Sequence, residues 1–449
     1  MKIARLLSVC ITALLFSFTA FLVGFVTPDA VDAINAKNPQ DFVASLQLLP
    51  DRFEQLTSPS TQDDQSQLPV IDTYWTVLNE LSDKYYGKKI DEREMTYSAI
   101  RGMLEALNDP YTRFLDPKEA KDMREQNEGN FVGIGAHLDT DKKTHQVYVK
   151  EPLDNSPAKE KGLKAGDIII KVDGKPIAGM DIEDVVSKIR GKQDTVVRLT
   201  IHRPKVQKLM EFRIVRKVVQ YQMVPDPQMV DEAHKIGYIK LRGFNEKSDE
   251  QFNAALNSLE KRGMKALILD LRDNPGGLLT AAVDIGSRFV ESGPIVIIQE
   301  RGNRRSTLDV ETEKHNHKRY PLAVLVNGRS ASASEIVSGA IRDNHVGTLI
   351  GTTTFGKGKV QTIVPLVDGS SVSITTAKYL TPAGTDINKV GIKPDIVVEI
   401  PEAVESQAEA GDTKNDKQLL KAEDFLRKQL NVADGSSAAT EPKSTREVP

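Results

Sequence analysis

The fold is decided by residues 321–361, which read PLAVLVNGRSASASEIVSGAIRDNHVGTLIGTTTFGKGKVQ. Residues 322–326 form a short apolar run, the pattern of a strand buried on both faces. After an Asn-Gly pair, apolar residues recur three or four positions apart over residues 333–341, which predicts one buried face of a helix. The stretch therefore predicts a strand, a tight corner and a helix.

Three serines, Ser330, Ser332 and Ser334, lie where the predicted strand turns into the predicted helix. Backbone N–H groups at a helix start have no intrahelical partner, and the helix dipole favours negative charge there. A serine at this corner therefore has donors for an oxyanion close by. Lys357 follows between two glycines, whose conformational freedom allows a tight turn that points an ammonium group inward. Each feature alone also fits a helix cap or a solvated lysine.

Two other catalytic templates fit this stretch less well. Residues 351–357 match the first seven positions of a phosphate-binding loop, but Gly358 stands where Ser or Thr should hold magnesium, and a strand is expected next. A Ser-His-Asp triad needs a histidine as its base. His345 is the nearest in sequence of the seven histidines, and its place at a predicted helix end favours a surface side chain.

The segment SASASEI at 330–336, followed by FGKGKVQ at 355–361, resembles the signature of the carboxyl-terminal processing proteases, also called tail-specific proteases. These are serine endopeptidases that combine a Ser-Lys dyad with a PDZ domain. The resemblance implies that Ser332 is the nucleophile and that Lys357, 25 positions on, is the general base. It also implies that Gln361 orients the lysine.

The resemblance extends to the corner LDLRDNPGGLL at 269–279. There it implies an oxyanion hole formed by the N–H groups of Gly277 and Ala333, although the choice between Gly276 and Gly277 stays open. The implied fold class is α/β (mixed α+β), a ClpP/crotonase-like protease core with an inserted PDZ domain and an N-terminal helical segment.

Residues 131–203 resemble a PDZ domain. The glycines of FVGIG match its carboxylate-binding loop, which makes Gly133, Ile134 and Gly135 the predicted peptide-binding residues. A lone Gly-x-Gly would equally fit a bulge at a strand end. The segment SPAKEKGLKAGDIIIKVDGKPI at 156–177 supplies the rest of the pattern. A peptide is expected to add as a strand beside the helix predicted around residues 182–189.

The chain has 449 residues, too many for a single core. The sequence pattern together with the family resemblance predicts six segments: 1–28 a signal-anchor or transmembrane segment, 29–68 a linker, 69–127 an N-terminal helical segment that packs on the core, 128–203 the PDZ domain, 204–401 the protease core, and 402–449 a helix with a disordered tail. Aromatic residues of the helical segment, such as Trp75, Tyr111 and Phe114, are expected in core or interdomain packing.

The N-terminal segment predicts the location. Lys2 and Arg5 precede an uncharged run from Leu6 to Val26, 21 residues that are long enough to cross a bilayer. The positive flank places the N-terminus in the cytoplasm and the rest outside. An uncleaved anchor is favoured over a cleaved signal peptide. With the family resemblance, this predicts the bacterial cell envelope, on the periplasmic side of the inner membrane.

Composition excludes several classes of protein. The net charge is −3 and the pI is near 6.2, so no nucleic-acid partner is expected. The single cysteine, Cys10, lies in the N-terminal apolar run, which leaves no disulfide or thiol-metal chemistry for the exported part. His315 and His317 have no further ligand at metal spacing. No cofactor and no metal are expected.

The predicted function is a serine endopeptidase that cuts envelope proteins near their C-termini and is gated by its PDZ domain. Lys357 must be neutral to act, so an apolar pocket without an acidic neighbour is expected around it, with Phe355, Val360 and Ile336 as walls. The alternatives are an inactive membrane-tethered PDZ adaptor, and an esterase or amidase with the same dyad. Expected partners are proteins with accessible C-termini; an adaptor or activator protein and a second copy of the chain are further candidates.

Overall fold

The structure, a computed structural model, describes residues 68–399, except 142 and 316–317, together with residues 416–437. The predicted membrane segment, the linker up to residue 67 and the C-terminal tail lie outside the described residues. None of the described helices combines the length and apolar character that a bilayer span requires. The chain divides into two compact units, residues 1–96 and residues 97–449.

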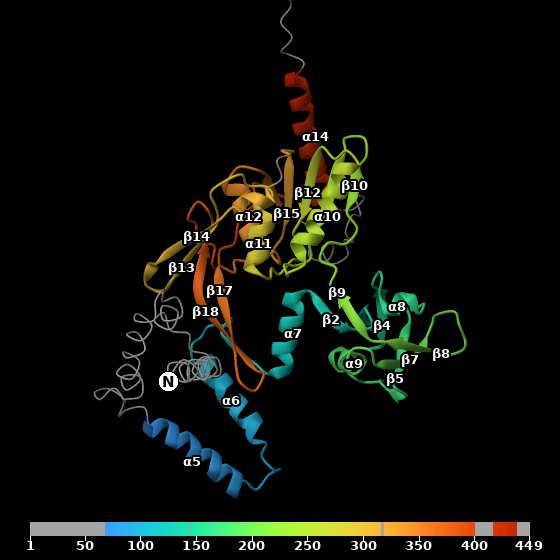
Figure 1. Cartoon of the computed structure of the whole chain (residues 1–449), viewed down its shortest axis with the longest axis vertical. Helices are drawn as coiled ribbons and strands as arrows, with labels where there is room; N and C mark the ends of the chain where they lie inside the picture. The colour runs from blue at the N-terminus through green and yellow to red at the C-terminus, as the bar shows by residue number, and fades with distance from the viewer. Residues whose placement is uncertain (1–67, 142, 316–317, 400–415, 438–449) are drawn as a thin grey trace, which may run out of the picture. The chain divides into compact units, whose positions relative to one another are not determined.

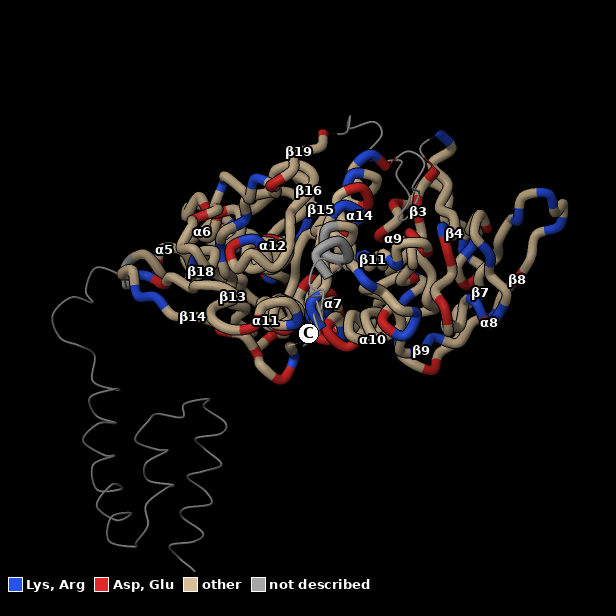
Figure 2. Tube along the Cα trace, turned by 90° about the horizontal axis from the view of Figure 1, so that it is seen from above, with Lys and Arg blue, Asp and Glu red and all other residues tan. Residues whose placement is uncertain are grey.

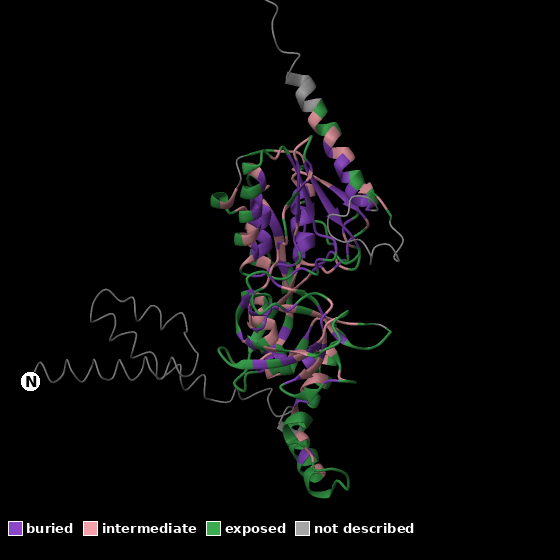
Figure 3. Ribbon diagram, turned by 90° about the vertical axis from the view of Figure 1, so that its right-hand side faces the viewer, coloured by how far each residue is buried: buried purple, intermediate pink, exposed green. Residues whose placement is uncertain are grey.

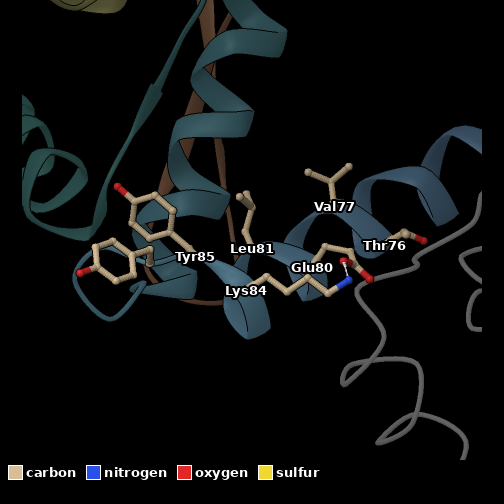
Figure 4. Close-up of a pocket in the computed structure, with 7 residues that line it drawn as sticks. Thr76, Val77, Glu80, Leu81, Lys84 and Tyr85 are labelled. Carbon is tan, nitrogen blue, oxygen red and sulfur yellow. Dashed lines mark ion pairs between the residues drawn. The ribbon is translucent and has the colours of Figure 1, made fainter.

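In the first unit, α5 (Leu68–Lys84) leads to α6 (Glu92–Glu105), which continues into the second unit. The Tyr74 hydroxyl donates to Thr96 Oγ1 at 3.2 Å. Side chains along one side of α5 line a surface depression, with Tyr85 just beyond the end of the helix (Figure 4). Trp75 is 54% exposed, so it does not lie in a core of the described part of the chain, and the alternative of interdomain packing stays a prediction.

The predicted protease core is built on a six-stranded sheet in the order β10-β11-β12-β15-β16-β19 (Figure 1). All neighbouring pairs are parallel except β10 and β11. β11 and β12 are joined by a helix and pair in parallel. The strands are β10 (Gln228–Asp231), β11 (Ile236–Lys240), β12 (Ala266–Asp270), β15 (Leu322–Val326), β16 (Thr348–Gly351) and β19 (Ile396–Val397).

Alternate residues of these strands face two different helical layers, which is why the strands read as continuous apolar runs. On one face, Leu267 and Leu269 pack in a core with α10 (Ser248–Lys261), α11 (Leu279–Ser287) and α12 (Ala333–Asp343). On the other face, Ala266 and Ile268 pack with α14 (Lys417–Ser437). The buried residues gather in these layers (Figure 3). The sheet thus holds the start of α12 rigidly beside the loop after β12.

A second, antiparallel sheet lies beside the first, in the order β1-β18-β13-β14, with β17 also paired to β18. Its strands are β1 (Arg113–Leu115), β13 (Pro294–Glu300), β14 (Arg305–Asp309), β17 (Lys359–Pro365) and β18 (Ser371–Leu380). The hairpin of β17 and β18 turns at Asp368-Gly369. Short 3₁₀ turns at Arg301–Asn303 and Thr312–Lys314 flank β14. Because β17 begins two residues after Lys357, this sheet anchors the lysine loop.

The PDZ segment is an insertion between two paired strands. After α7 (Pro117–Glu128), β2 (Asn130–Gly133) runs antiparallel to β9 (Lys217–Gln220), so the chain leaves and re-enters the core at one ribbon. Between them lie a sheet in the order β3-β4-β5-β7-β8, with β6 on β5, and two short helices. These elements are β3 (Ala136–Thr140), β4 (Val147–Pro152), α8 (Pro157–Glu160), β5 (Ile168–Val172), β6 (Lys175–Pro176), α9 (Ile182–Ile189), β7 (Val196–His202) and β8 (Met210–Val215).

Charged residues of both signs are scattered along the described chain (Figure 2). A buried arginine joins the sheet to the C-terminal helix: Arg272, two residues after the end of β12, donates to Asp270 Oδ1 (2.9 Å) and to Asp416 Oδ1 (2.9 Å). All three side chains are nearly inaccessible to water. The loop that follows β12 is thereby tied to the start of α14.

Candidate active site

The three serines at the corner between β15 and α12 have different environments. Ser330 donates its hydroxyl proton to the carbonyl oxygen of Leu271 (2.8 Å), and Ser334 donates to that of Asn274 (2.9 Å). Both hydroxyls therefore tie the corner to the loop after β12. Ser332 is partly exposed and donates its hydroxyl proton to no other residue in the described part of the chain. Of the three, Ser332 has the proton that a base could remove.

The backbone at Ser332 is unusual. Its φ of 55° and ψ of −113° fall outside the regions that residues with a side chain normally adopt. Such strain persists only where the surroundings enforce it, and it is concentrated at functional sites. Gly276 lies directly against this corner, because a Cβ atom there would be 2.8 Å from Ser332 Cβ. The sharp corner therefore requires a glycine opposite it.

A buried carboxylate links the serine corner to the lysine loop. Glu335, in the first turn of α12, is completely inaccessible to water. Its Oε2 accepts hydrogen bonds from the N–H groups of Ser332 (2.8 Å) and Lys357 (2.9 Å). Its Oε1 accepts from Thr354 Oγ1 (2.6 Å) and from the N–H of Gly356 (2.7 Å). One side chain thus holds the backbones of Ser332 and Lys357 at the same oxygen atom.

Tyr379 on β18 makes the complementary link through carbonyl groups. Its single hydroxyl proton is shared between the carbonyl oxygens of Ser332 (3.1 Å) and Lys357, both of which lie within hydrogen-bond distance of the hydroxyl oxygen. Burial, reinforced by the Glu335 charge, raises the pKa of Tyr379 well above its ordinary value, so it stays a neutral donor. Glu335 binds backbone N–H groups, and Tyr379 binds backbone carbonyl groups, of both Ser332 and Lys357. Together the two side chains fix the position of the serine corner relative to the lysine loop.

The two predicted oxyanion donors lie at this corner. The N–H of Gly276 donates to Asn274 Oδ1 (2.9 Å), whereas those of Gly277 and Ala333 have no hydrogen-bond acceptor among the described residues. The φ of Gly277 is 143°, and a Cβ atom there would be 1.9 Å from the carbonyl oxygen of Phe244. The position therefore demands glycine. Of the two glycines that the sequence left open, Gly277 has the available N–H.

The surroundings of Lys357 are polar as well as apolar. The side chain is half-buried, and its Nζ lies 5.0 Å from the centre of the Tyr111 ring. Burial lowers the pKa of Lys357 and the charge of Arg113 adds to this, while Glu335 opposes it. The expected pocket without an acidic neighbour is therefore wrong, because Glu335 serves as a backbone anchor. Phe355 is 55% exposed and is not the wall that the sequence suggested.

The predicted dyad is not hydrogen-bonded in this structure. No hydrogen bond joins Lys357 Nζ to Ser332 Oγ or to Gln361, all of which belong to the described residues. The Nε2 atom of Gln361 is buried and has no partner. The backbone around Ser332 and Lys357 is thus fully anchored, while the side chains that would exchange a proton are not yet in contact.

The predicted peptide-binding loop lies between β2 and β3. The carbonyl oxygen of Ile134 accepts from the N–H of Ala158 (2.8 Å), and that of Gly135 accepts from the N–H of Leu153 (3.0 Å). In the described chain, the N–H groups of Ile134 and Gly135 have no acceptor of their own. Gly133 ends β2. Because β3 is an edge strand with α9 packed beside it, the loop opens toward a strand edge that a peptide could extend.

Metal ligation finds no support in the described residues, which contain no group of three His, Cys, Asp or Glu side chains able to hold an ion. His137 in the PDZ segment has a lowered pKa because of burial, but it has no such cluster around it.

Three segments of the chain match known families. Residues 235–398 match Peptidase family S41, residues 148–203 match the PDZ domain, and residues 50–119 match the activating protease CtpB N-terminal domain. The chain is also 37% identical over 372 residues to a carboxy-terminal-processing protease of Bartonella bacilliformis, an alignment that covers 80% of this chain and 82% of that protein. This chain belongs to the carboxy-terminal processing protease family.

A second relative supports the same assignment. The carboxy-terminal processing protease CtpB of Bacillus subtilis is 38% identical over 325 residues, covering 72% of this chain and 67% of that protein. Among solved structures, the photosystem II D1 C-terminal processing protease is 34% identical, covers 74% of this chain and 89% of its own, and has a TM-score of 0.43. The predicted family, the mixed α/β fold with a PDZ domain and the serine-type endopeptidase class are confirmed.

The sequence analysis missed Glu335 and Tyr379. The first had a signal, because Ser332 and Glu335 stand in the spacing of a capping box, in which the glutamate side chain binds the N–H of the serine. Tyr379 had none, since its role depends on how the antiparallel sheet meets α12. The sequence predicts only core or interdomain packing for Tyr111 and does not predict its contact with Lys357.

Proposed function

We propose that this carboxy-terminal processing protease hydrolyses peptide bonds near protein C-termini with Ser332 and Lys357 as a catalytic dyad. The observation that carries the proposal is the shared anchor of the two residues: one oxygen of the buried Glu335 carboxylate accepts from the backbone N–H of both. A corner with only a structural role would not need to hold the backbone of Lys357 beside the strained backbone of Ser332 at the start of α12.

In the proposed reaction, neutral Lys357 takes the hydroxyl proton of Ser332 as the oxygen attacks the scissile carbonyl carbon. The N–H groups of Gly277 and Ala333 then donate to the oxyanion of the tetrahedral intermediate. Lys357 returns the proton to the leaving amine, which leaves an acyl group on Ser332. A water molecule, deprotonated by Lys357, hydrolyses this ester. Burial supports the role of the base because it lowers the pKa of Lys357.

Gln361 has a role that suits its chemistry. A neutral amide can hydrogen-bond the amine of Lys357 without stabilising the ammonium form as a carboxylate would. Its buried Nε2 has no partner at present, so it gains a hydrogen bond when it meets the lone pair of a neutral lysine. In the proposal, Gln361 therefore holds Lys357 in the state that accepts a proton.

The PDZ domain selects and delivers the substrate in this proposal. The free N–H groups of Ile134 and Gly135, in the loop that begins at Gly133, bind the terminal carboxylate, and the residues before it add to the edge of β3. Gating would act through α7, which joins the PDZ segment to the core: Arg190, at the end of α9, donates to Asp122 on α7 (2.7 Å). The N-terminal apolar segment would hold the enzyme at the periplasmic side of the inner membrane, where envelope proteins are the substrates.

The alternative of an inactive PDZ adaptor requires no anchored dyad and no free oxyanion donors. Cleavage of a loosely folded reporter with an apolar C-terminal tail separates the two. The proposal expects cutting by the wild-type chain and none by Ser332→Ala or Lys357→Ala. Equal cutting by all three chains would refute the dyad, and binding of the tail without cutting by any chain, also after addition of a peptide that binds the PDZ domain, would favour the adaptor.

A further inference from the structure

The loop before β1 brings an aromatic ring to the proposed catalytic lysine. Residues 109–112 read DPYT, and the Tyr111 ring centre lies 5.0 Å from Lys357 Nζ and 5.9 Å from Lys359 Nζ. Both distances are within the range at which an ammonium group is attracted to the negative face of a ring. A neutral amine carries no charge for this attraction, so the contact favours the protonated lysine.

The loop is held firmly against the antiparallel sheet. Within it, Thr112 Oγ1 donates to Asp109 Oδ2 (2.9 Å), and the N–H of Thr375 on β18 donates to Thr112 Oγ1 (3.0 Å). The strand that follows pairs with β18, with Arg113 opposite Ser373. The position of the Tyr111 ring is therefore set by β18, the same strand whose Tyr379 binds the backbones of Ser332 and Lys357.

The carboxylate in this loop is committed to the other lysine. Asp109 Oδ1 is 3.0 Å from Lys359 Nζ. Burial opposes ionisation of Asp109, but hydrogen bonds, those from Lys359 and Thr112 among them, outweigh it and lower its pKa to about 2. Lys359 is therefore neutralised by an aspartate that stays charged, whereas Lys357 has the ring in place of a carboxylate beside its Nζ. The charged groups that act on Lys357 are Arg113 from β1 and Glu335 from α12, while the pair of Lys359 and Asp109 lies at the same ring.

We propose that Tyr111 is a positioning residue that holds the Lys357 side chain in a protonated resting position, away from Ser332 and Gln361, until the lysine leaves the ring. The inference rests on the proposed dyad. It accounts for two observations together: the missing hydrogen bond between Lys357 Nζ and Ser332 Oγ, and the buried Nε2 of Gln361 that lacks a partner. When Lys357 Nζ leaves the ring, it becomes available to both Ser332 Oγ and Gln361 Nε2. Anything that moves the 109–112 loop on β18 would then control the base.

The test is the pH profile of kcat/KM for reporter cleavage, whose acidic limb reports the pKa of the base in the free enzyme. Tyr111→Leu removes the ring but keeps an apolar side chain of moderate size. Loss of a cation–π contact is expected to move the limb to lower pH by about half a unit to one and a half units. Below the limb, activity would then rise about 3- to 30-fold, because more lysine is neutral.

Two further variants at the same position keep the test decisive. Tyr111→Phe retains the ring, and its acidic limb is expected at the same pH as that of the wild type, because the ring face and not the hydroxyl makes the contact. If Tyr111→Leu does not yield folded protein, Tyr111→Trp replaces it, and the stronger attraction of indole is expected to move the limb to higher pH. A leucine variant that folds and loses activity at every pH without moving the limb would overturn the inference, since a merely structural role gives that result.

Failure of the inference is distinguishable from failure of the dyad. If Lys357→Ala is inactive while Tyr111→Leu has the wild-type pH profile, the dyad stands and the role of Tyr111 is refuted. If Lys357→Ala retains full activity, the dyad itself is refuted, and the inference with it.

Discussion

Replacing Glu335 by glutamine tests the anchor on which the proposed site depends. The carboxylate is fully buried and accepts four hydrogen bonds, two at each oxygen. A glutamine keeps one acceptor oxygen and presents an NH₂ group in place of the other. In either orientation of the amide, two of the four donors that surround the side chain therefore face its NH₂ group in place of an acceptor. Loss of two hydrogen bonds to a charged group costs about 3 to 6 kcal/mol, at about 1.5 to 3 kcal/mol each.

The expected result of Glu335→Gln is a lower free energy of unfolding by this amount and a large loss of kcat. The backbones of Ser332 and Lys357 lose their common acceptor, and a misplacement of about 1 Å in a reacting group can cost on the order of 10²-fold in rate. Binding of a C-terminal peptide is expected to stay normal, because the PDZ groove makes no contact with this carboxylate. Denaturant unfolding, kcat and peptide affinity measure the three quantities.

Glu423→Gln is the matched control. Glu423 is also buried, but it lies on α14 at the opposite face of the sheet and accepts from Arg427 (2.7 Å). Its replacement is expected to leave kcat unchanged. The reasoning would be refuted if Glu335→Gln kept both the wild-type free energy of unfolding and the wild-type kcat, or if Glu423→Gln lost as much activity.

Three further predictions follow from particular contacts. Gly277→Ala places a Cβ atom 1.9 Å from the carbonyl oxygen of Phe244 and disturbs an oxyanion donor, so kcat should fall about 10²- to 10³-fold with a lower Tm, measured by single-turnover acylation and thermal unfolding. Asp109 has a pKa of about 2 in the folded protein, below its ordinary value of 3.8, so its stabilisation of about 2 kcal/mol is present above about pH 4 and lost as the pH falls toward 2. In Asp109→Asn the free energy of unfolding should therefore change less with pH over this range, and a pH dependence equal to that of the wild type would contradict the assignment. Asp416→Ala leaves the buried Arg272 guanidinium with one carboxylate partner fewer, which should cost about 3 to 5 kcal/mol in denaturant unfolding, whereas a loss below 1 kcal/mol would show that the pair is not a significant anchor of α14.

The sequence predicts the central corner well, for reasons that are local. The strand at 322–326 and the helix after it have strong apolar periodicity, and the structure has them at Leu322–Val326 and Ala333–Asp343. The short separation in sequence between Ser332 and Lys357 also predicts that the lysine loop lies near this corner. The choice of Ser332 among three serines came from family resemblance, and the structure adds a physical reason, since Ser330 and Ser334 use their hydroxyls to hold the loop after β12.

What sequence reasoning could not supply are contacts between distant segments. Tyr111 and Tyr379 reach the site through β18, and no local pattern specifies how that antiparallel sheet meets α12. The exposure of Phe355 has the same origin, because an apolar residue in a glycine-rich loop is buried only if another segment covers it. Strain at Ser332 likewise follows from Gly276 and Glu335 acting together on one corner.

The most direct test of the central claim is labelling with a serine-reactive fluorophosphonate, followed by mass mapping of the adduct. The account predicts a single adduct on Ser332, with none on Ser330 or Ser334, and a labelling rate that rises with pH as Lys357 loses its proton. In Lys357→Ala, labelling should fall to background. An adduct on another serine, or equal labelling of Ser332 without Lys357, would contradict the Ser-Lys dyad.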